Sequence, residues 1–207
     1  MNVREAIERG DVSALQSTLR DDPASRDAVI HWGPKNKNAC HPLHYVCDKV
    51  FDGTLSPEQS TALARVLIAA GADVTFQNGD PLIAAASLGA VEVAFELLEA
   101  GARHDLLAPG GETPLHWAAF VGSDRLVQRL IQLGAPLEVR DREWDTTPLG
   151  WALHGWKSAP VPADGAGHRQ TVMHLISAGA AVDPMWLEWR EVRSDPEVLA
   201  ALRGGRL

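Results

Sequence analysis

The stretch that decides the fold is Thr113-Pro114-Leu115-His116-Trp117-Ala118. Variants of its first four residues occur three more times along the chain: His41-Pro42-Leu43-His44, Asp80-Pro81-Leu82-Ile83 and Thr147-Pro148-Leu149-Gly150. The four prolines are 39, 33 and 34 residues apart, and each is followed by an apolar segment that ends in Gly-Ala: Gly71-Ala72, Gly101-Ala102, Gly134-Ala135 and Gly179-Ala180. A period of this length indicates a stack of repeated structural units.

The residues of one repeat predict a pair of helices. Thr113 is suited to cap a helix, and Pro114 then occupies the first helical position, where its missing N–H costs nothing. The second helix carries an apolar stripe on one side: Leu126, Val127, Leu130 and Ile131. Gly134 suits the left-handed position after that helix. Because one helix pair cannot bury its own apolar face, we expect the repeats to stack.

This pattern resembles the ankyrin family, whose repeat of about 33 residues carries a T-P-L-H-x-A signature. The segment Thr113–Ala118 matches that signature at every defined position. The resemblance implies an all-α solenoid of helix-turn-helix units, forming a single domain over 1–207. We expect six units, of which the first and the last are caps: 1–22, 38–72, 78–102, 111–135, 145–180 and 183–207.

The expected repeats depart from the family pattern in several places. Extra residues near 50–57 and near 157–167 separate the two helices of a repeat, and we expect them to form loops opposite the turn tips. The stretch between Asp22 and Asn38 is long for a turn between repeats. The link Gly71–Asp80 is short, which disfavours the usual finger-like turn there.

The two caps are expected to be shorter helix pairs. Residues 3–20 predict two helices broken at Gly10-Asp11. Near the C-terminus, we expect one helix from Pro184 to Val192 and a second from Asp195 to Leu202, with Ser194 as the N-cap.

Composition and charge narrow the class of protein. The net charge is −8 and neither half of the chain is basic, so we expect no nucleic-acid partner and no binding to anionic membranes. The N-terminal MNVREAIERGD lacks the apolar run of a signal peptide. Two cysteines exclude a disulfide scaffold and favour a reducing compartment. We therefore expect a cytoplasmic protein, and the run Thr147–Gly155 resembles bacterial ankyrin proteins.

The resemblance also implies where a partner binds. Ankyrin proteins bind other proteins through the turn tips and the exposed side of the first helices, which together form a concave surface. By position, the candidates in this chain are Trp32, Lys35, Lys37, Asp48, Lys49, Gln77, Asn78, Ser87, Leu88, Glu112, Phe120, Val121, Arg142, Glu143, Trp144, Asp145, His154 and Trp156.

The aromatic candidates are the most informative. Phe120, Trp144 and Trp156 stand near arginine, a combination typical of binding hot spots. The alternative is that these rings only cover the long insertion or the caps. Four further tryptophans are expected to be structural, two in the core and two in the C-terminal cap: Trp117, Trp151, Trp186 and Trp189.

Two thiols and two imidazoles offer the ligand types that zinc prefers: Cys40, His41, His44 and Cys47. We expect Cys40, His44 and Cys47 to share one helix face. However, their spacing differs from that of known zinc modules, and each residue has a place in the repeat. His41 replaces the capping Thr, His44 is the signature histidine, and Cys47 fills a small-residue position. We therefore expect no metal and no cofactor.

The sequence carries no motif for catalysis: no G-x-S-x-G, P-loop, dinucleotide fingerprint or H-E-x-x-H. His154, His168 and His174 straddle the second insertion near Asp164, where we expect solvated side chains. The leading hypothesis is a protein-protein interaction module, monomeric when free, acting as an inhibitor or a toxin-neutralising protein in its sharper form. The alternatives are a small-molecule- or metal-dependent activity at the insertions or the Cys40/His44/Cys47 group, and a homo-oligomer formed through exposed Trp.

Overall fold

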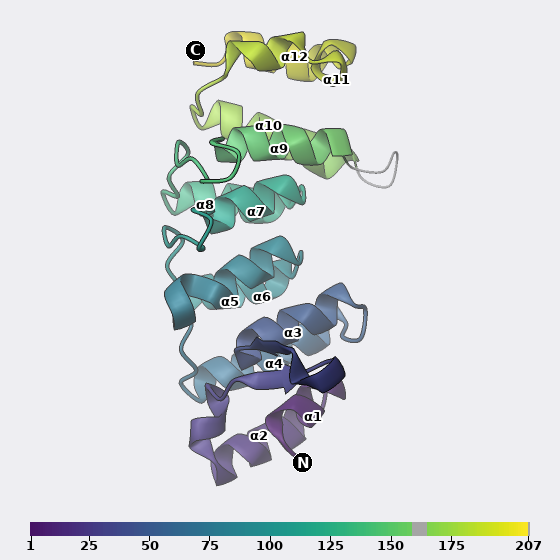
Figure 1. Ribbon diagram of the computed structural model, residues 1–207, viewed down its shortest axis with the longest axis vertical. Helices are drawn as coiled ribbons and strands as arrows, with labels where there is room; N and C mark the ends of the chain where they lie inside the picture. Colours follow the sequence, from purple (N-terminus) through teal and green to yellow (C-terminus); the bar gives the residue numbers. More distant parts are fainter. Residues whose placement is uncertain (159–164, 207) are drawn as a thin grey trace. The chain divides into compact units, whose positions relative to one another are not determined.

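Six helix pairs follow one another in the computed structural model, which describes residues 1–158 and 165–206 (Figure 1). They are α1 (Val3–Glu8) with α2 (Val12–Asp21), α3 (Pro42–Phe51) with α4 (Pro57–Ala69), α5 (Phe76–Ser87) with α6 (Val91–Glu99), α7 (Pro114–Phe120) with α8 (Asp124–Gln132), α9 (Pro148–Ser158) with α10 (Gly165–Ser177), and α11 (Arg190–Ser194) with α12 (Pro196–Gly204). The chain forms two compact units, Met1–Arg103 and His104–Leu207, with three pairs in each. The predicted all-α repeat fold is confirmed.

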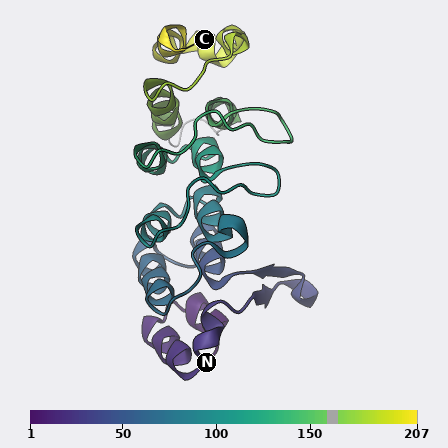
Figure 2. The same cartoon turned by 90° about the vertical axis from the view of Figure 1, so that its left-hand side faces the viewer.

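Within each unit, like helices stack on like. In the first unit, α1 packs on α3 and α3 on α5, while α2 packs on α4 and α4 on α6. In the second unit, α7 packs on α9, and α8 and α12 pack on α10. Figure 2 shows the resulting two layers in each unit, with the longer turns extending on the side of the first helices. Within each unit, the turns and the first helices therefore lie on the same side.

The signature residues act locally as the sequence predicts. Thr113 Oγ1 accepts a hydrogen bond from the His116 N–H, and His116 Nδ1 accepts one from the Thr113 N–H at 3.0 Å. The other ring nitrogen of His116 lies 3.4 Å from the Thr146 carbonyl oxygen, in the turn before the next repeat. The signature therefore caps α7 and also fixes the turn that leads into α9.

Small residues let the first helices approach closely. Ala118 and Ala119 of α7 are fully buried. At Gly155 of α9, a Cβ atom would lie only 1.9 Å from the carbonyl oxygen of Phe120. The backbones of α7 and α9 are therefore in direct contact at this point.

Both insertions lengthen helices, so the prediction of simple loops was wrong in part. Around the first insertion, α3 continues to Phe51 and α4 begins at Pro57, because Ser56 and Gln59 form a capping box there. Only residues 52–56 remain as a loop. Around the second insertion, α9 runs to Ser158 and α10 begins at Gly165. The rest of that insertion, 159–164, lies outside the described residues.

The stretch before α3 forms a β-hairpin. Strand β1 (Ile30–Trp32) pairs antiparallel with β2 (Asn38–Cys40), with Ile30 opposite Cys40. Two 3₁₀ helices, η1 (Pro23–Arg26) and η2 (Pro34–Asn36), complete the long turn. The link before Asp80 has no hairpin and instead turns through Gln77, Asn78 and Gly79, all with positive φ. The sequence predicted that difference.

The C-terminal cap differs in detail from the prediction. Pro184–Glu188 form a 3₁₀ helix, η3, and the α-helix α11 begins only at Arg190. The N-cap of α12 is Asp195 and not Ser194, since the Asp195 carboxylate accepts from the Glu197 and Val198 N–H groups. Pro196 then takes the first helical position. Within the described residues, no helix combines the length and the apolar character that crossing a bilayer requires.

Candidate functional site

An aromatic cluster surrounds Trp151 on the first-helix side of the second unit. The Trp151 side chain is almost fully buried, and its ring centroid lies 4.9 Å from that of Trp117 and 5.0 Å from that of Trp144. Phe120 and His116 complete the cluster, with centroids 5.8 Å and 5.5 Å from that of Trp151. Trp144 is 59% exposed and Phe120 is 36% exposed. The cluster thus has a buried base and an aromatic rim open to solvent.

Asp141 holds the turn that carries Trp144. Its Oδ1 atom accepts from the N–H groups of Glu143, at 2.9 Å, and Trp144, at 2.7 Å. Its Oδ2 atom accepts from the Thr146 N–H at 3.2 Å and from the Trp151 indole N–H at 3.0 Å. Burial alone would raise the pKa of Asp141, but these four donors together lower it. The carboxylate stays ionised and fixes Trp144 beside Trp151.

Two adjoining hollows lie against this cluster. The smaller has a volume of about 280 Å³ and is lined by Phe120, Trp144, Thr146, Trp151, His154 and Ser158. The larger, about 500 Å³, shares Trp144, Thr146 and His154 with it and extends to the C-terminal cap, where Met185 and Trp189 line it. We call the two hollows together the aromatic groove; the large apolar side chains in its lining include Phe120, Trp144, Trp151, Met185, Trp186 and Trp189.

The far end of the aromatic groove combines rings with positive charge. The His154 and Trp189 ring centroids are 4.9 Å apart, and Lys157 Nζ lies 5.3 Å from the Trp189 centroid. Burial and then the Lys157 charge lower the pKa of His154, so its ring is neutral at pH 7. At the edge, Arg140 and Asp145 form an exposed ion pair. The smaller hollow, whose described lining has no titratable side chain other than His154, suits an apolar side chain of a partner, whereas charged residues such as Glu138 and Asp183 line the larger one.

The predicted candidates of the second unit divide into two groups. Phe120, Trp144 and His154 line the groove, with Asp145 at its edge. The remaining candidates are not among its lining residues: Glu112, Val121, Arg142, Glu143 and Trp156.

Three of these have visible local roles. Val121 is the C-cap of α7, Arg142 bonds to the Pro109 carbonyl oxygen, and Trp156 is half-buried on α9. Met185, which is 69% exposed, and Trp189 were not predicted as binding residues.

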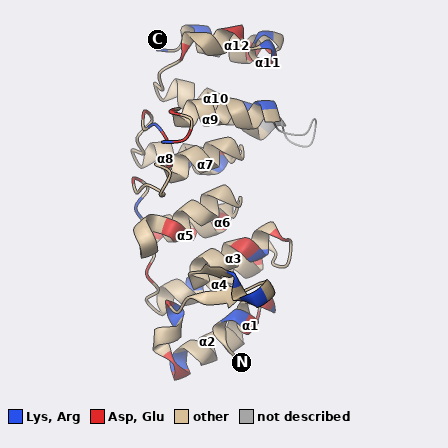
Figure 3. Cartoon of the chain, in the orientation of Figure 1, with Lys and Arg blue, Asp and Glu red and all other residues tan. Residues whose placement is uncertain are grey.

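Candidates of the first unit gather no comparable apolar surface. Trp32 packs edge-on against buried Tyr45 with centroids 5.0 Å apart, so its role is structural. Lys35 and Lys37 are exposed at the hairpin tip, where Figure 3 shows basic residues. Lys49 lies over the Tyr45 ring and pairs with Asp52. The remaining candidates, exposed or half-buried, are Asp48, Gln77, Asn78, Ser87 and Leu88.

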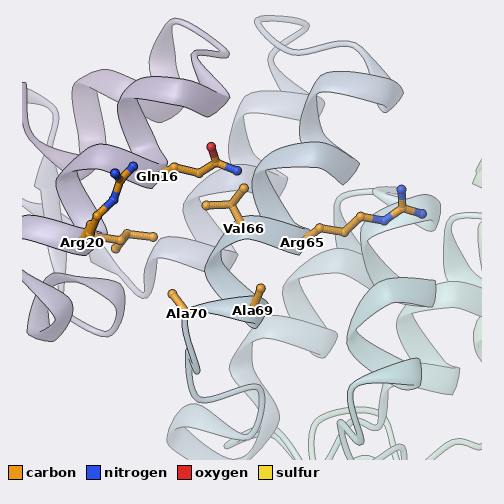
Figure 4. A pocket seen from close by; sticks show the side chains of 7 residues that line it. Gln16, Arg20, Arg65, Val66, Ala69 and Ala70 are labelled. Atoms are coloured by element: carbon orange, nitrogen blue, oxygen red, sulfur yellow. The ribbon is translucent and has the colours of Figure 1, made fainter.

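A further hollow of about 630 Å³ lies on the second-helix layer of the first unit, between α2 and α4 (Figure 4). Gln16 and Arg20 face Val66, Ala69 and Ala70 across it. Arg65 points away from this hollow and binds Glu96 through two hydrogen bonds. The lining offers small side chains and exposed polar groups, and none of the predicted site residues.

The cysteine and histidine residues near α3 do not assemble as predicted. Cys47 is fully buried and its thiol donates to the Leu43 carbonyl oxygen, so the expected face of Cys40, His44 and Cys47 was wrong. Cys40 and His44 gather instead with Asp48, and their donor atoms lie within 4.8 Å of one another. Burial and then the Asp48 charge raise the pKa of Cys40 well above its usual range, so the free thiol is not an activated nucleophile.

Two of the histidines that flank the second insertion have separate contacts. His168 lies 3.2 Å from the Phe120 carbonyl oxygen through its Nε2 atom, while His154 faces Trp189. Asp164 lies outside the described residues.

Comparison with known families decides the identity of the repeat. A family model described as ankyrin repeats (3 copies) matches residues 54–141 and 82–185, which together cover well over half of the chain. The chain belongs to the ankyrin-repeat family. Ankyrin repeats are protein-interaction modules, and the aromatic groove lies within and beside the matched repeats of the second unit.

Two curated relatives carry similar ankyrin regions. The putative palmitoyltransferase ZDHHC13 of Danio rerio is 34% identical over 101 residues, covering 48% of this chain and 14% of the relative. The palmitoyltransferase Hip14 of Drosophila melanogaster is 30% identical over 105 residues, covering 50% of this chain and 14% of the relative. The chain therefore matches about a seventh of the length of these relatives, within ankyrin repeats.

Proposed function

We propose that this ankyrin-repeat chain binds another protein through the aromatic groove of its second unit, and that it acts by binding rather than by catalysis. The observation that carries the proposal is the pairing of exposed Trp144 with buried Trp151 above a hollow of about 280 Å³. Monomeric soluble proteins rarely expose large apolar patches that serve no purpose.

The turn that carries Trp144 is ordered before any partner arrives. Four hydrogen bonds to Asp141 hold the turn, and the Trp144 ring packs at a tilt against Trp151, which together restrict the indole. A side chain ordered in advance loses little conformational entropy on binding, which is a cost of about 0.5–1.5 kcal/mol for each mobile side chain. Rigid aromatic anchors of this kind dominate the binding energy of many interfaces.

The size and lining of the smaller hollow favour a side chain of a partner over a free metabolite. Pockets for small ligands usually start at about 300 Å³ and are closed over most of the ligand. Here the hollow is smaller and continues directly into the larger one. Among the described residues that line it, the polar side chains are Thr146, His154 and Ser158, with no carboxylate to complete an acid–base pair. One bulky apolar side chain of a partner would fill it.

The biological consequence of the proposal is binding without catalysis. A binding protein of this kind blocks or bridges its partner, which is why inhibition or toxin neutralisation is the sharper form of the proposal. A specific interface would bury at least about 1,000 Å² in total. We also propose that the free chain is monomeric, so that the groove is available to the partner.

A capture experiment from the lysate of the source organism tests the proposal. The full chain is immobilised as wild type, as Trp144→Ala and as Phe51→Ala, and retained proteins are quantified by mass spectrometry. Phe51 is the matched control, because its ring is 71% exposed, belongs to the first unit and is not among the residues that line the groove. The expected result is a protein retained by wild type and by Phe51→Ala but lost from Trp144→Ala.

The retained protein is then purified and titrated against each variant. Loss of a hot-spot side chain costs at least about 2 kcal/mol, so Trp144→Ala should raise Kd by about 30-fold or more. Equal retention and equal Kd for all three forms would place the contact outside the aromatic groove and end the proposal.

A further inference from the structure

Three potential metal ligands meet on one face of α3 in the first unit. Cys40 ends β2, and His44 and Asp48 follow at intervals of four residues, which brings the two helical residues onto the same face. Cys40 Sγ lies 3.9 Å from Asp48 Oδ2, and His44 Nε2 lies 3.9 Å from Asp48 Oδ1. One donor atom from each residue lies within 4.8 Å of the other two. Sulfur, nitrogen and oxygen donors therefore surround one point.

A fourth residue orients the imidazole. The Nδ1 atom of His44 lies 3.0 Å and 2.9 Å from the two carboxylate oxygens of Asp80, at the start of the next repeat. When neutral, a ring that donates its Nδ1–H to a carboxylate has an unprotonated Nε2, and here Nε2 lies 3.9 Å from Asp48 Oδ1. Metal-binding histidines are typically held by a carboxylate in this way, which fixes the ring and strengthens the ligand. This second observation distinguishes the group from a chance cluster.

Asp80 has two contexts in the structure. It corresponds to Thr113 of the signature, a helix-capping position that Asp also suits. Asp80 follows the positive-φ residues 77–79, and its carboxylate pairs with His44 on the neighbouring repeat. The site is partly open, since about a quarter of the His44 and Asp48 side-chain surfaces is exposed. An ion could therefore enter without unfolding of the hairpin.

We propose that Cys40, His44 and Asp48 bind one Zn²⁺ ion, with Asp80 as the positioning residue for His44. A thiolate, an imidazole and a carboxylate suit zinc, whereas Mg²⁺ and Ca²⁺ select oxygen ligands. Ligand atoms in a tetrahedral zinc site are about 3.4 Å apart. The two 3.9 Å separations involve different Asp48 oxygens, and one donor atom from each residue lies within 4.8 Å of the others, so the side chains need to move closer by about 0.5–1.4 Å. On binding, the Cys40 S–H proton is released to solvent and a Zn–S bond replaces it.

The ion would join the hairpin to α3, and Asp80 would link the site to α5 through His44. Cys40 belongs to the hairpin, His44 and Asp48 to α3, and Asp80 to α5. Three protein ligands leave a fourth coordination position for water or for a ligand from outside. The first consequence is structural, since an ion that binds only the folded chain stabilises it.

The test uses the full chain, freed of metal with a chelator and titrated with Zn²⁺ and, separately, with Co²⁺ as a spectroscopic probe. We expect one ion per chain and, with Co²⁺, a thiolate-to-metal charge-transfer band. Cys40→Ser should abolish that band and weaken Zn²⁺ binding by at least about 100-fold, while Asp80→Asn should weaken binding by about 10- to 100-fold and keep the band. Far-UV circular dichroism of each metal-free variant checks that it folds.

Cys47→Ala is the matched control. It removes the other thiol of the chain, which is buried and bonded to Leu43, and it restores the alanine that Ala119 represents in the third repeat. Its zinc affinity and cobalt band should equal those of the wild type. The proposal is overturned if the wild type binds no stoichiometric Zn²⁺, if Cys40→Ser binds as tightly as wild type, or if the band depends on Cys47.

Discussion

Replacing Asp141 with Asn tests whether the Trp144 turn is held by the hydrogen bonds of one buried carboxylate. Asp141 accepts four of them, two on each oxygen, and its side chain is almost fully buried. Asn has the same shape but only one acceptor oxygen, so its NH₂ group must face two of the four donors. Hydrogen bonds to charged groups contribute about 1.5–3 kcal/mol each. With the lower value for each of the two lost hydrogen bonds, Asp141→Asn should cost about 3 kcal/mol.

Asp145→Asn provides a matched control on the same turn. It removes the same charge, but the Asp145 side chain is 85% exposed and pairs with Arg140 only at 3.7 Å. Exposed ion pairs contribute about 0–1 kcal/mol. Asp145 also has φ +48°, a conformation that Asn tolerates well. This variant should therefore leave stability nearly unchanged.

Urea unfolding followed by far-UV circular dichroism measures the stability difference, and near-UV circular dichroism reports on the coupled Trp144 and Trp151 rings. We expect Asp141→Asn to lower the free energy of unfolding and to weaken the near-UV signal. It should also weaken partner binding by about 2- to 10-fold, because Trp144 is no longer ordered in advance. A loss below about 0.5 kcal/mol with an unchanged near-UV spectrum, or an equal loss in Asp145→Asn, would refute the assignment to these hydrogen bonds.

Two further predictions concern the second unit. Burial lowers the pKa of His116, so the folded state favours the neutral ring. The unfolded chain binds a proton at this ring near its ordinary pKa of about 6.5, so the folded state loses stability as the pH falls below about 6.5. Melting temperatures between pH 7.5 and 5.5 should fall more for wild type than for His116→Gln, which keeps the capping box without a titrating ring; parallel profiles would contradict this. Gly155→Ala should cost about 1–3 kcal/mol or more, because its Cβ would lie 1.9 Å from the Phe120 carbonyl oxygen. Gly204→Ala, with no atom within 4 Å of the new Cβ, should be neutral in the same denaturation assay, and equal costs would argue against close α7–α9 packing.

The sequence predicts the elements that local chemistry determines. Thr113 and His116 form a capping box because their spacing alone brings the hydroxyl and the ring to the helix end. The sequence predicted Ser194 as the N-cap of α12, but Asp195 is the N-cap. Local chemistry favours Asp195, because Pro196 suits the first helical position that follows it. The lengths of α3 and α9 were also missed, since extra residues between two helices can extend the helices as well as form a loop.

The candidate sites depend on contacts that no local pattern contains. Trp144 could be singled out because an aromatic residue at an exposed turn tip is unusual. Its fixation by Asp141 could not, since that requires the turn to close onto the Trp151 indole. The sequence also does not predict that Asp48 and Asp80 lie beside Cys40 and His44, because these contacts join different elements. Their meeting depends on the hairpin placing Cys40 over α3 and on the register between two repeats.

The histidine of the signature, His116 in one repeat and His44 in another, lies next to each of the two candidate sites. Where the signature is intact, one ring nitrogen of His116 accepts a hydrogen bond from the Thr113 N–H. The other lies 3.4 Å from the Thr146 carbonyl oxygen, so both ring nitrogens are engaged, one at the cap and the other at the next turn. That turn is the one that displays Trp144. Where Thr is replaced by Asp80, His44 bonds to the carboxylate through Nδ1 and leaves Nε2 toward Asp48. The same histidine position therefore has different partners in the two units: His116 contacts the turn that carries Trp144, whereas His44 lies between the carboxylates of Asp80 and Asp48.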